Sequence, residues 1–387
     1  MRSINFVFAF LVPSLVVFGI LVSCAPSTTA PSAIATPAPQ LQATKPVWQS
    51  QWEKMVADGQ REGKVSIYSS MASELRAGLG QAFKEKFGIT PDFYTGKAAE
   101  VTVKIMAERR AGIYLADVVS MGPDNFLYDF KPAGTLQSLD PFIVLPEVLD
   151  KQVWFGGQGL RFIDKEHTVL RMLAYMTPSI LINTNLVRPE DTKSYKDLLS
   201  PKWKGKIVMG DPTVPGTAGA WFRGMALSIS GPEYLKELAK QEPVILRDDR
   251  LLVDWVAKDK YAIALALKSD IISEYIRAGS PLKNVIPTEG ANLTSGGGCV
   301  VLMNSAPHPN AAAVFINWML TREAQTLRSQ IERTQSARLD VPTDHLETAW
   351  LRNPSVKYYD NDDEKMLTQA ADARKLATDI FGPLMAR

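Results

Sequence analysis

The chain has 387 residues, of which 46% are apolar and 22% charged, and its formal net charge is +2. Since domains average about 150 residues, this length predicts two lobes, each able to bury a core. The near-neutral balance excludes the basic footprint of a nucleic-acid-binding protein.

The first 24 residues have the composition of an export signal. Arg2 supplies a positive charge, and residues 6–21 are almost wholly apolar, as in a secretory signal peptide. The segment ends in Leu21-Val22-Ser23-Cys24, which resembles the lipobox of bacterial lipoproteins. We therefore expect an exported protein whose Cys24 is lipidated, anchored to the outer face of the cytoplasmic membrane or held in the periplasm. A membrane-spanning helix is the alternative interpretation.

A spacer follows the export signal. From Ala25 to about Pro46 the chain is mostly Ala, Pro, Ser, Thr and Gln, with no charge before Lys45. Such a segment cannot bury a core, so it predicts a flexible tether. With Cys24 acylated, Cys299 has no disulfide partner, and its apolar neighbours place it in a buried strand.

Strand-like and helical patterns alternate at the start of the globular part. A lead-in helix is expected over 48–60, strands over 65–68, 90–94 and 117–121, and helices between them. This alternation predicts a parallel sheet with helices on both faces. Small or polar residues follow each strand, at Ser69-Ser70, Thr95-Gly96-Lys97 and Gly122-Pro123.

The stretch 201–222 is the most informative part of the second half. A basic turn with Gly205 precedes an apolar strand over 207–209, and the loop from Asp211 to Gly216 opens a helix at Thr217 that should reach Leu227. The N–H groups at such a helix start point at whatever lies above the sheet. In an open α/β sheet that place is the ligand crevice. In isolation, the pattern favours an ordinary strand–helix turn, and it is the recurrence of similar units along the chain that favours a ligand crevice.

The remaining elements complete a second sheet and return the chain to the first. The segment 136–177 is irregular, as expected where the chain crosses from one lobe to the other. The Gly-rich run 294–298 is typical of a hinge or of the crossing back to the first lobe. Strands are expected over 179–183, 261–267 and 284–286, and helices over 232–240, 251–258, 311–320, 322–333 and 363–378.

No catalytic motif is present. The sequence contains no G-x-S-x-G, P-loop or H-E-x-x-H pattern, and His167, His308 and His345 lie far apart. Ser295 precedes three glycines but has no evident base. The Tyr358-Tyr359 pair could indicate a metal site, but its acid-rich neighbours favour a surface segment. We expect no enzyme activity, no cofactor and no bound metal.

These features together resemble an extracellular solute-binding protein of a bacterial ABC importer, in the class that includes ferric-ion, thiamine, polyamine and sugar-phosphate binders. The resemblance covers Glu62 to about Pro342 and implies an α/β, two-lobed periplasmic-binding-protein-like type II fold with crossing strands between the lobes. It also implies a monomer that captures a small-molecule solute and delivers it to permease subunits. The resemblance rests on the lipobox and tether and on EGKVSIYSS, ADVVSMGPDNF, LINTNLV, PKWKGKIVMGDP with GTAGAW, and APHPNAAAVFINWML.

The same resemblance divides the chain into segments and implies which loops face the cleft. His308 precedes a helix that matches a packing element, so we expect it to be structural. The expected segments are a lipoprotein signal peptide (1–24), a tether and lead-in helix (25–60), lobe 1 (61–172), lobe 2 (173–289), the return to lobe 1 (290–335) and a C-terminal segment packing on lobe 2 (336–387). The implied ligand-binding residues are Ser69, Ser70, Gly96, Lys97, Gly122, Pro123, Asp211, Thr213, Gly216, Thr217, Lys268, Ser269 and Asp270.

The expected ligand is a small anionic organic solute. Ferric-binding members of the class hold the metal with two adjacent tyrosines after the strand that corresponds to 261–267, where this chain has Lys268-Ser269-Asp270. A lysine there favours a phosphate or a carboxylate over a trivalent cation. Two alternatives stay open: a ferric-iron-binding protein using Tyr275 or Tyr358-Tyr359, and a lipoprotein sensor built on the same fold.

Overall fold

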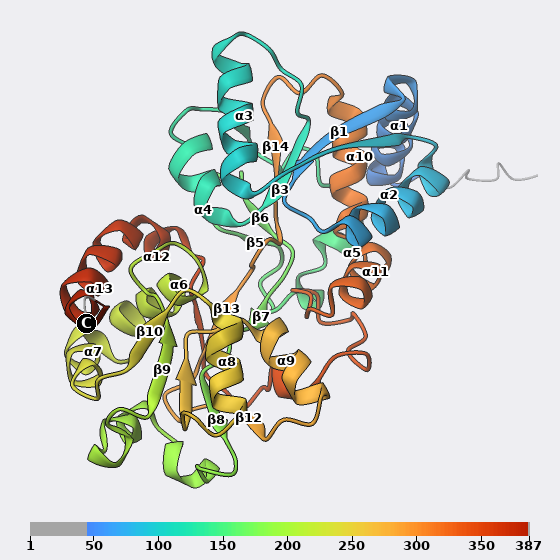
Figure 1. Cartoon of the computed structure of the whole chain (residues 1–387). Helices are drawn as coiled ribbons and strands as arrows, with labels where there is room; N and C mark the ends of the chain where they lie inside the picture. The colour runs from blue at the N-terminus through green and yellow to red at the C-terminus, as the bar shows by residue number, and fades with distance from the viewer. Residues whose placement is uncertain (1–44, 386–387) are drawn as a thin grey trace, which may run out of the picture. The chain divides into compact units, whose positions relative to one another are not determined.

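The computed structural model describes residues 45–385 (Figure 1). The predicted signal peptide, Cys24 and nearly all of the tether lie outside these residues. Within them, a seven-stranded and a five-stranded sheet each carry helices, and a three-stranded sheet lies at the crossings between them. We call the part around the seven-stranded sheet the first lobe and the part around the five-stranded sheet the second lobe. The predicted α/β fold with two lobes and crossing strands is confirmed.

The first sheet has the strand order β2-β1-β3-β14-β6-β5, with β4 also paired to β14. Strands β1, β2 and β3 are parallel, as predicted, and β14 runs antiparallel to β3. The carboxyl ends of the three parallel strands therefore meet at one edge. The strands are β1 (Lys64–Ser69), β2 (Thr90–Thr95), β3 (Val118–Met121), β4 (Leu136–Gln137), β5 (Arg161–Phe162), β6 (Leu170–Arg171) and β14 (Cys299–Met303).

Helices cover this sheet because their apolar stripes match its faces. The predicted stripe of α2 is confirmed, since Leu75, Leu79, Phe83 and Phe87 are all buried in one core. The predicted structural role of His308 also agrees with the structure: its backbone N–H donates to Asp117 Oδ1 at 2.7 Å. The helices are α1 (Val47–Glu62), α2 (Ser73–Phe87), α3 (Ala98–Arg110), α4 (Pro123–Asn125), η1 (Phe126–Phe130), α5 (Pro146–Leu149), η2 (Lys151–Val153), α10 (Pro309–Met319) and α11 (Arg322–Glu332).

The second sheet has the order β10-β9-β11-β8-β12. Strands β10, β9 and β11 are parallel, and β8 and β12 run antiparallel to their neighbours. The strand predicted over 261–267 is shorter, because Ala266 adopts a positive φ of 60° that takes the chain out of the sheet. The strands are β8 (Ile180–Asn183), β9 (Ile207–Gly210), β10 (Val244–Leu246), β11 (Ile263–Leu265) and β12 (Leu282–Val285).

The helices of the second lobe follow the parallel strands. The helix predicted from Thr217 to Leu227 starts as expected, but a π-helical turn, η6, replaces its end. The basic turn is confirmed, with Gly205 at φ 69°. The helices are η3 (Pro189–Thr192), η4 (Tyr195–Leu199), η5 (Pro201–Trp203), α6 (Thr217–Gly224), η6 (Met225–Ile229), α7 (Gly231–Ala239), α8 (Asp249–Ala257) and α9 (Ser269–Arg277).

The third sheet consists of crossing segments. Strand β13 (Ala291–Thr294) pairs with β7 (Tyr175–Met176) on one side and with β15 (Tyr358–Asp360) on the other. The predicted return crossing is confirmed, since the run 294–298 leads from β13 into β14. Tyr358 and Tyr359, expected in a surface segment, are partly buried residues of the edge strand β15 and pair their backbone with β13.

The C-terminal segment contacts both lobes. A single helix over 363–378 was expected, but two are present, α12 (Glu364–Thr368) and α13 (Ala370–Met385), after the short turn η7 (Thr348–Trp350). Leu367 of α12 is buried in the first-lobe core, and Tyr128 of η1 donates a hydrogen bond to its carbonyl. Phe381 of α13 is buried in the second-lobe core, beside α6 and α7. Figure 1 shows α12 and α13, in red, next to α6 and α7.

Candidate functional site

The carboxyl edge of the second-lobe parallel strands brings a helix start directly over the sheet. A Cβ at Gly210 would lie 2.7 Å from the Ala266 carbonyl oxygen and 3.0 Å from the Ala218 Cβ. Only a residue without a side chain permits this approach, so Gly210 lets the first turn of α6 sit on the ends of β9 and β11. Gly216, at φ 132°, makes the sharp entry into that helix.

Two helix N-termini at this edge are open. Helices α6 and α9 have no side-chain cap. In residues 45–385, the N–H groups of 217–219 and 269–271 donate no hydrogen bond to a protein group. Unsatisfied N–H groups and the positive end of the helix dipole together attract anions. Predicted residues Thr217, Ser269 and Asp270 lie on these two first turns.

Two cationic side chains belong to the same edge. Lys268, exposed, immediately precedes α9 and forms no ion pair within the described residues. Arg247 directly follows β10, and its Nε donates to Asp211 Oδ2 at 2.8 Å. The sequence analysis missed Arg247 because it did not predict β10, and so had no reason to place residue 247 at the carboxyl edge.

Asp211 shapes the loop between β9 and α6. Its Oδ1 accepts from the Thr213 N–H at 2.8 Å and from the Thr213 hydroxyl at 2.6 Å. Burial alone would raise the pKa of Asp211, but the hydrogen bonds from Thr213 and Arg247 hold it below its usual value. With its oxygens engaged, this buried carboxylate positions Arg247. Direct contact of Asp211 or Thr213 with a solute stays a prediction.

The predicted residues of the first lobe come together at the ends of β1, β2 and β3. The Gly96 N–H donates to the Ser69 carbonyl at 3.2 Å, and the Ser70 N–H donates to the Ser120 carbonyl at 3.2 Å. A Cβ on Gly122 would lie 3.1 Å from the Gly296 carbonyl oxygen, which brings the return crossing to this edge.

The side chains at this first-lobe edge differ in their exposure to solvent. Ser70 and Lys97 are exposed, whereas Ser69 and Pro123 are buried. Glu100 Oε2 accepts from the Lys97 N–H at 3.1 Å, so a carboxylate already lies at the start of α3. This edge therefore offers fewer free donors to an anion than the second-lobe edge.

A hollow of about 180 Å³ lies beside α9. Tyr175 of the crossing strand β7 forms one wall, and Asp270 of α9 forms another. Burial, and then the carboxylates of Asp362, Glu332 and Asp270, raise the pKa of Tyr175 to about 12. The lining residues are Tyr175, Met176, Ser269, Asp270, Ser273, Glu274, Arg277, Glu332, Arg333, Thr334, Gln335, Leu346, Glu347, Trp350 and Leu351.

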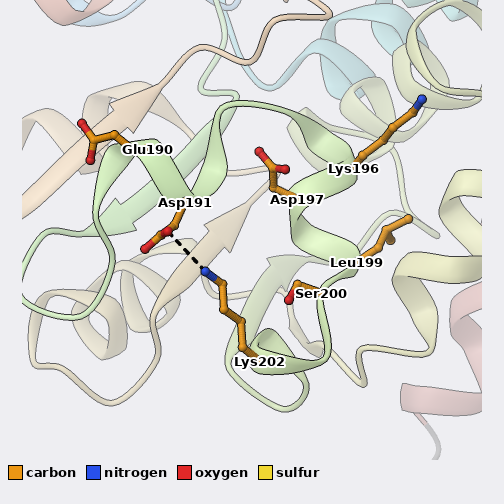
Figure 2. A pocket seen from close by; sticks show the side chains of 7 residues that line it. All are labelled: Glu190, Asp191, Lys196, Asp197, Leu199, Ser200 and Lys202. Carbon is orange, nitrogen blue, oxygen red and sulfur yellow. Dashed lines mark ion pairs between the residues drawn. The ribbon is translucent and has the colours of Figure 1, made fainter.

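A larger hollow, of about 490 Å³, lies on the second lobe between η3, η4 and η5 (Figure 2). Its charged groups serve local structure: Asp197 accepts from the Ser194 N–H at 2.8 Å, and Lys202 pairs with Asp191 at 3.4 Å. Figure 2 shows that Glu190 and Lys196 point in different directions. Since no set of free polar groups converges there, we do not place the site in this hollow.

Comparison with known proteins agrees with this geometry. A sequence profile described as bacterial extracellular solute-binding protein matches residues 78–355. An uncharacterized protein from Haemophilus influenzae is 25% identical over 69% of this chain and 75% of its own length.

Two solved structures show the same fold. The Trichodesmium protein IdiA (FutA) in complex with iron and citrate has a TM-score of 0.63 and 19% identity, over 82% of this chain and 99% of that one. The periplasmic binding protein AfuA from Actinobacillus pleuropneumoniae, with fructose-6-phosphate bound, has a TM-score of 0.58 and 19% identity, over 84% and 99%.

The resemblance inferred from the sequence is thereby confirmed. The profile match covers well over half of the chain, and the two sheets with crossing strands are those of the two-lobed binding proteins. The chain belongs to the family of bacterial extracellular solute-binding proteins, which capture solutes for ABC importers.

Proposed function

We propose that this protein captures a small anionic organic solute between its two lobes and delivers it to the permease of an ABC importer. One observation carries the anionic assignment: the open N-termini of α6 and α9 lie at the same strand edge as Arg247 and Lys268. Backbone N–H groups and cationic side chains together hold phosphate or carboxylate oxygens through charge-assisted hydrogen bonds. The bound citrate and fructose-6-phosphate of two similar structures are anions of this kind.

Ferric iron is the second candidate, because one similar structure holds iron. The tyrosines available here fit it poorly. Tyr358 and Tyr359 are consecutive in β15, so their side chains point to opposite faces of the strand. Tyr275 lies 3.4 Å from Asp254 Oδ1, to which its hydroxyl donates. Within residues 45–385, no three His, Cys, Asp or Glu side chains are grouped so that they could hold a metal.

We propose a binding role without catalysis for this site. Ser295, considered above as a nucleophile, does have a neighbouring carboxylate, since its hydroxyl donates to Asp362 Oδ2 at 2.7 Å. However, Ser295 is fully buried, which leaves no approach for a substrate. A sensor function on the same fold would use the same solute site, and only its partner protein would differ.

A thermal-shift screen of residues 45–387 tests the anionic assignment. Citrate, sugar phosphates, inorganic phosphate, polyamines, neutral sugars and ferric citrate would each be added at increasing concentration. We expect an organic anion to stabilise the protein by about 2.7 kcal/mol at a hundredfold excess over its Kd. Ferric citrate should give no visible phenolate-to-iron absorption band. A band at one equivalent that is lost in Tyr275→Phe or Tyr358→Phe would instead establish iron as the ligand.

Lipid anchoring through Cys24 is part of the proposal. Replacing the thiol in Cys24→Ala removes the acylation site, so we expect the variant to accumulate unprocessed or to be released from the membrane. Membrane fractionation and the mass of the mature protein measure this, with Cys299→Ala as the matched cysteine control. A Cys24→Ala protein that still fractionates with membranes at the mature lipoprotein mass would contradict the proposal.

A further inference from the structure

The hollow beside α9 lies next to the strand edge and has charged groups of its own. Four carboxylates line it, those of Asp270, Glu274, Glu332 and Glu347, against two guanidinium groups, those of Arg277 and Arg333. At the strand edge, Arg247 is paired with Asp211, and Lys268 forms no ion pair within the described residues. Helix α9 joins the two regions, because Lys268 precedes it and Asp270 lies in its first turn.

Most of the charges around the hollow are already paired. Glu274 accepts from Arg250 at 2.7 Å, and Glu332 accepts from Arg328 at 2.7 Å. Glu347 pairs with Arg277. Asp270 forms no hydrogen bond or ion pair with its side chain anywhere in residues 45–385. Its carboxylate is therefore a free negative charge at this hollow. Arg333 likewise forms no ion pair in residues 45–385, and its Nη2 donates to the His345 carbonyl at 2.9 Å.

Tyr175 adds a polar group without a partner. Its side chain is partly buried, and its hydroxyl makes no hydrogen bond within the described residues. Burial and then the nearby carboxylates raise the pKa of Tyr175, and the negative field of those carboxylates favours a cation. The hydroxyl is not among the buried side-chain atoms that lack a partner, so a ligand group can reach it and form a hydrogen bond.

Trp350 forms an aromatic wall of the same hollow. Its Nε1 donates to the Ser273 hydroxyl at 2.7 Å, which fixes the indole to α9. The faces of aromatic rings attract cations, most strongly those of tryptophan. A carboxylate, an unpaired hydroxyl and an indole thus surround one small volume, and each of them favours an ammonium group over an anion.

We propose that this hollow binds the ammonium group of the solute while the edge formed by α6, α9, Arg247 and Lys268 binds its anionic group, so that the solute is a zwitterion. The inference rests on the proposed function, since it takes the anionic end of the solute from there. The hollow, at about 180 Å³, is large enough for an aminoalkyl group.

Matched probes test the two ends separately. Butanoate, 4-aminobutanoate and 1,4-diaminobutane form one series, and ethyl phosphate and phosphoethanolamine form a second. Thermal shift and calorimetric titration would be run on residues 45–387, on Asp270→Asn and on a control, Glu237→Gln, which removes an exposed carboxylate paired with Lys240. We expect the zwitterion of at least one series to bind about ten- to a hundredfold more tightly than its amine-free partner. Asp270→Asn should remove that preference without weakening the amine-free anions, because it takes a negative charge away from the start of α9, and Glu237→Gln should keep it.

Each of the other outcomes rejects the ammonium site, the proposed function, or both. If the amine-free anions bind as well as the zwitterions, or if Asp270→Asn keeps the preference, the ammonium site is wrong and the proposed function stands. If only 1,4-diaminobutane binds, and Asp270→Asn weakens it, the ammonium site stands and the anionic solute of the proposed function is wrong. If no probe binds at millimolar concentration, both are rejected.

Discussion

Asp360→Ala is expected to destabilise the protein by about 3–5 kcal/mol. Asp360 Oδ2, at the end of β15, accepts from Arg171 Nη1 of β6 at 2.5 Å and from Arg161 Nη2 of β5 at 2.8 Å, which ties the crossing sheet to the first sheet. The Arg171 side chain is 2% exposed, so removing the carboxylate leaves a buried guanidinium without its partner. Urea unfolding of wild type and variant measures the difference, with unchanged m-values as the sign that only stability has changed.

The control is an exposed ion pair. Glu237 lies 2.6 Å from Lys240, with about half of each side chain or more in solvent. Glu237→Ala should therefore cost less than about 1 kcal/mol. An Asp360→Ala protein as stable as Glu237→Ala would contradict the assigned role of the buried pair.

Acid should reduce the effect of Asp360→Ala. Burial would raise the pKa of Asp360, but the guanidinium groups of Arg171 and Arg161 and a backbone hydrogen bond lower it below its usual value. A lowered pKa means that the carboxylate stabilises the fold above its unfolded pKa of about 3.9 and loses this contribution as pH falls through the folded value. We expect the difference between wild type and variant to be constant from pH 7 to 5 and to shrink below pH 4.

Thr217→Trp is expected to weaken solute binding by at least about a hundredfold while leaving the fold intact, which corresponds to about 2.7 kcal/mol or more. Thr217 is the first residue of α6, so an indole there would cover the open N–H groups of 217–219. The residue is only partly buried, which leaves room for the larger side chain to turn away from the core. Calorimetric titration with the stabilising solute from the screen measures the affinity, and the unfolding midpoint checks the fold.

A matched substitution distinguishes blocking of the helix N-terminus from the general effect of adding a tryptophan. Thr378 is exposed on α13, so Thr378→Trp adds the same side chain away from the strand edge. We expect this control to bind as wild type does. Equal affinity of Thr217→Trp and wild type would move the anion site away from the start of α6.

Much of the fold could be predicted because local patterns decided it. The four-residue spacing of Leu75, Leu79, Phe83 and Phe87 defined α2, and alternating apolar runs defined the parallel strands. Strand β10 (Val244–Leu246) was missed because three residues carry too little periodicity, and only pairing with β9 defines it. Strand β15 was missed for a related reason. Its polar, acid-rich neighbours give no strand pattern in the sequence, and only its pairing with β13 defines it.

The candidate site was predictable at the level of loops and less so at the level of side chains. Parallel strands place their carboxyl ends together, so the positions after β9 and β11 could be named from the sequence. Whether a polar side chain there is free depends on tertiary partners. Arg247 donates to Asp211, and Glu100 already accepts from the Lys97 N–H at the start of α3. The unpaired hydroxyl of Tyr175 likewise shows only once β7, α9 and the segment after α11 are assembled.

The C-terminal segment sets a kinetic property of the protein. Lys131 lies 2.5 Å from Glu364 of α12, and Tyr128 donates to the Leu367 carbonyl, whereas α13 is buried against the second lobe. Any opening that separates η1 from α12 must break these contacts. Each hydrogen bond of this kind contributes about 1 kcal/mol, so the two together can lengthen the residence time of a trapped solute by about thirtyfold. Substitutions in residues 361–385 would then change how long the solute stays bound without altering a residue proposed to touch it.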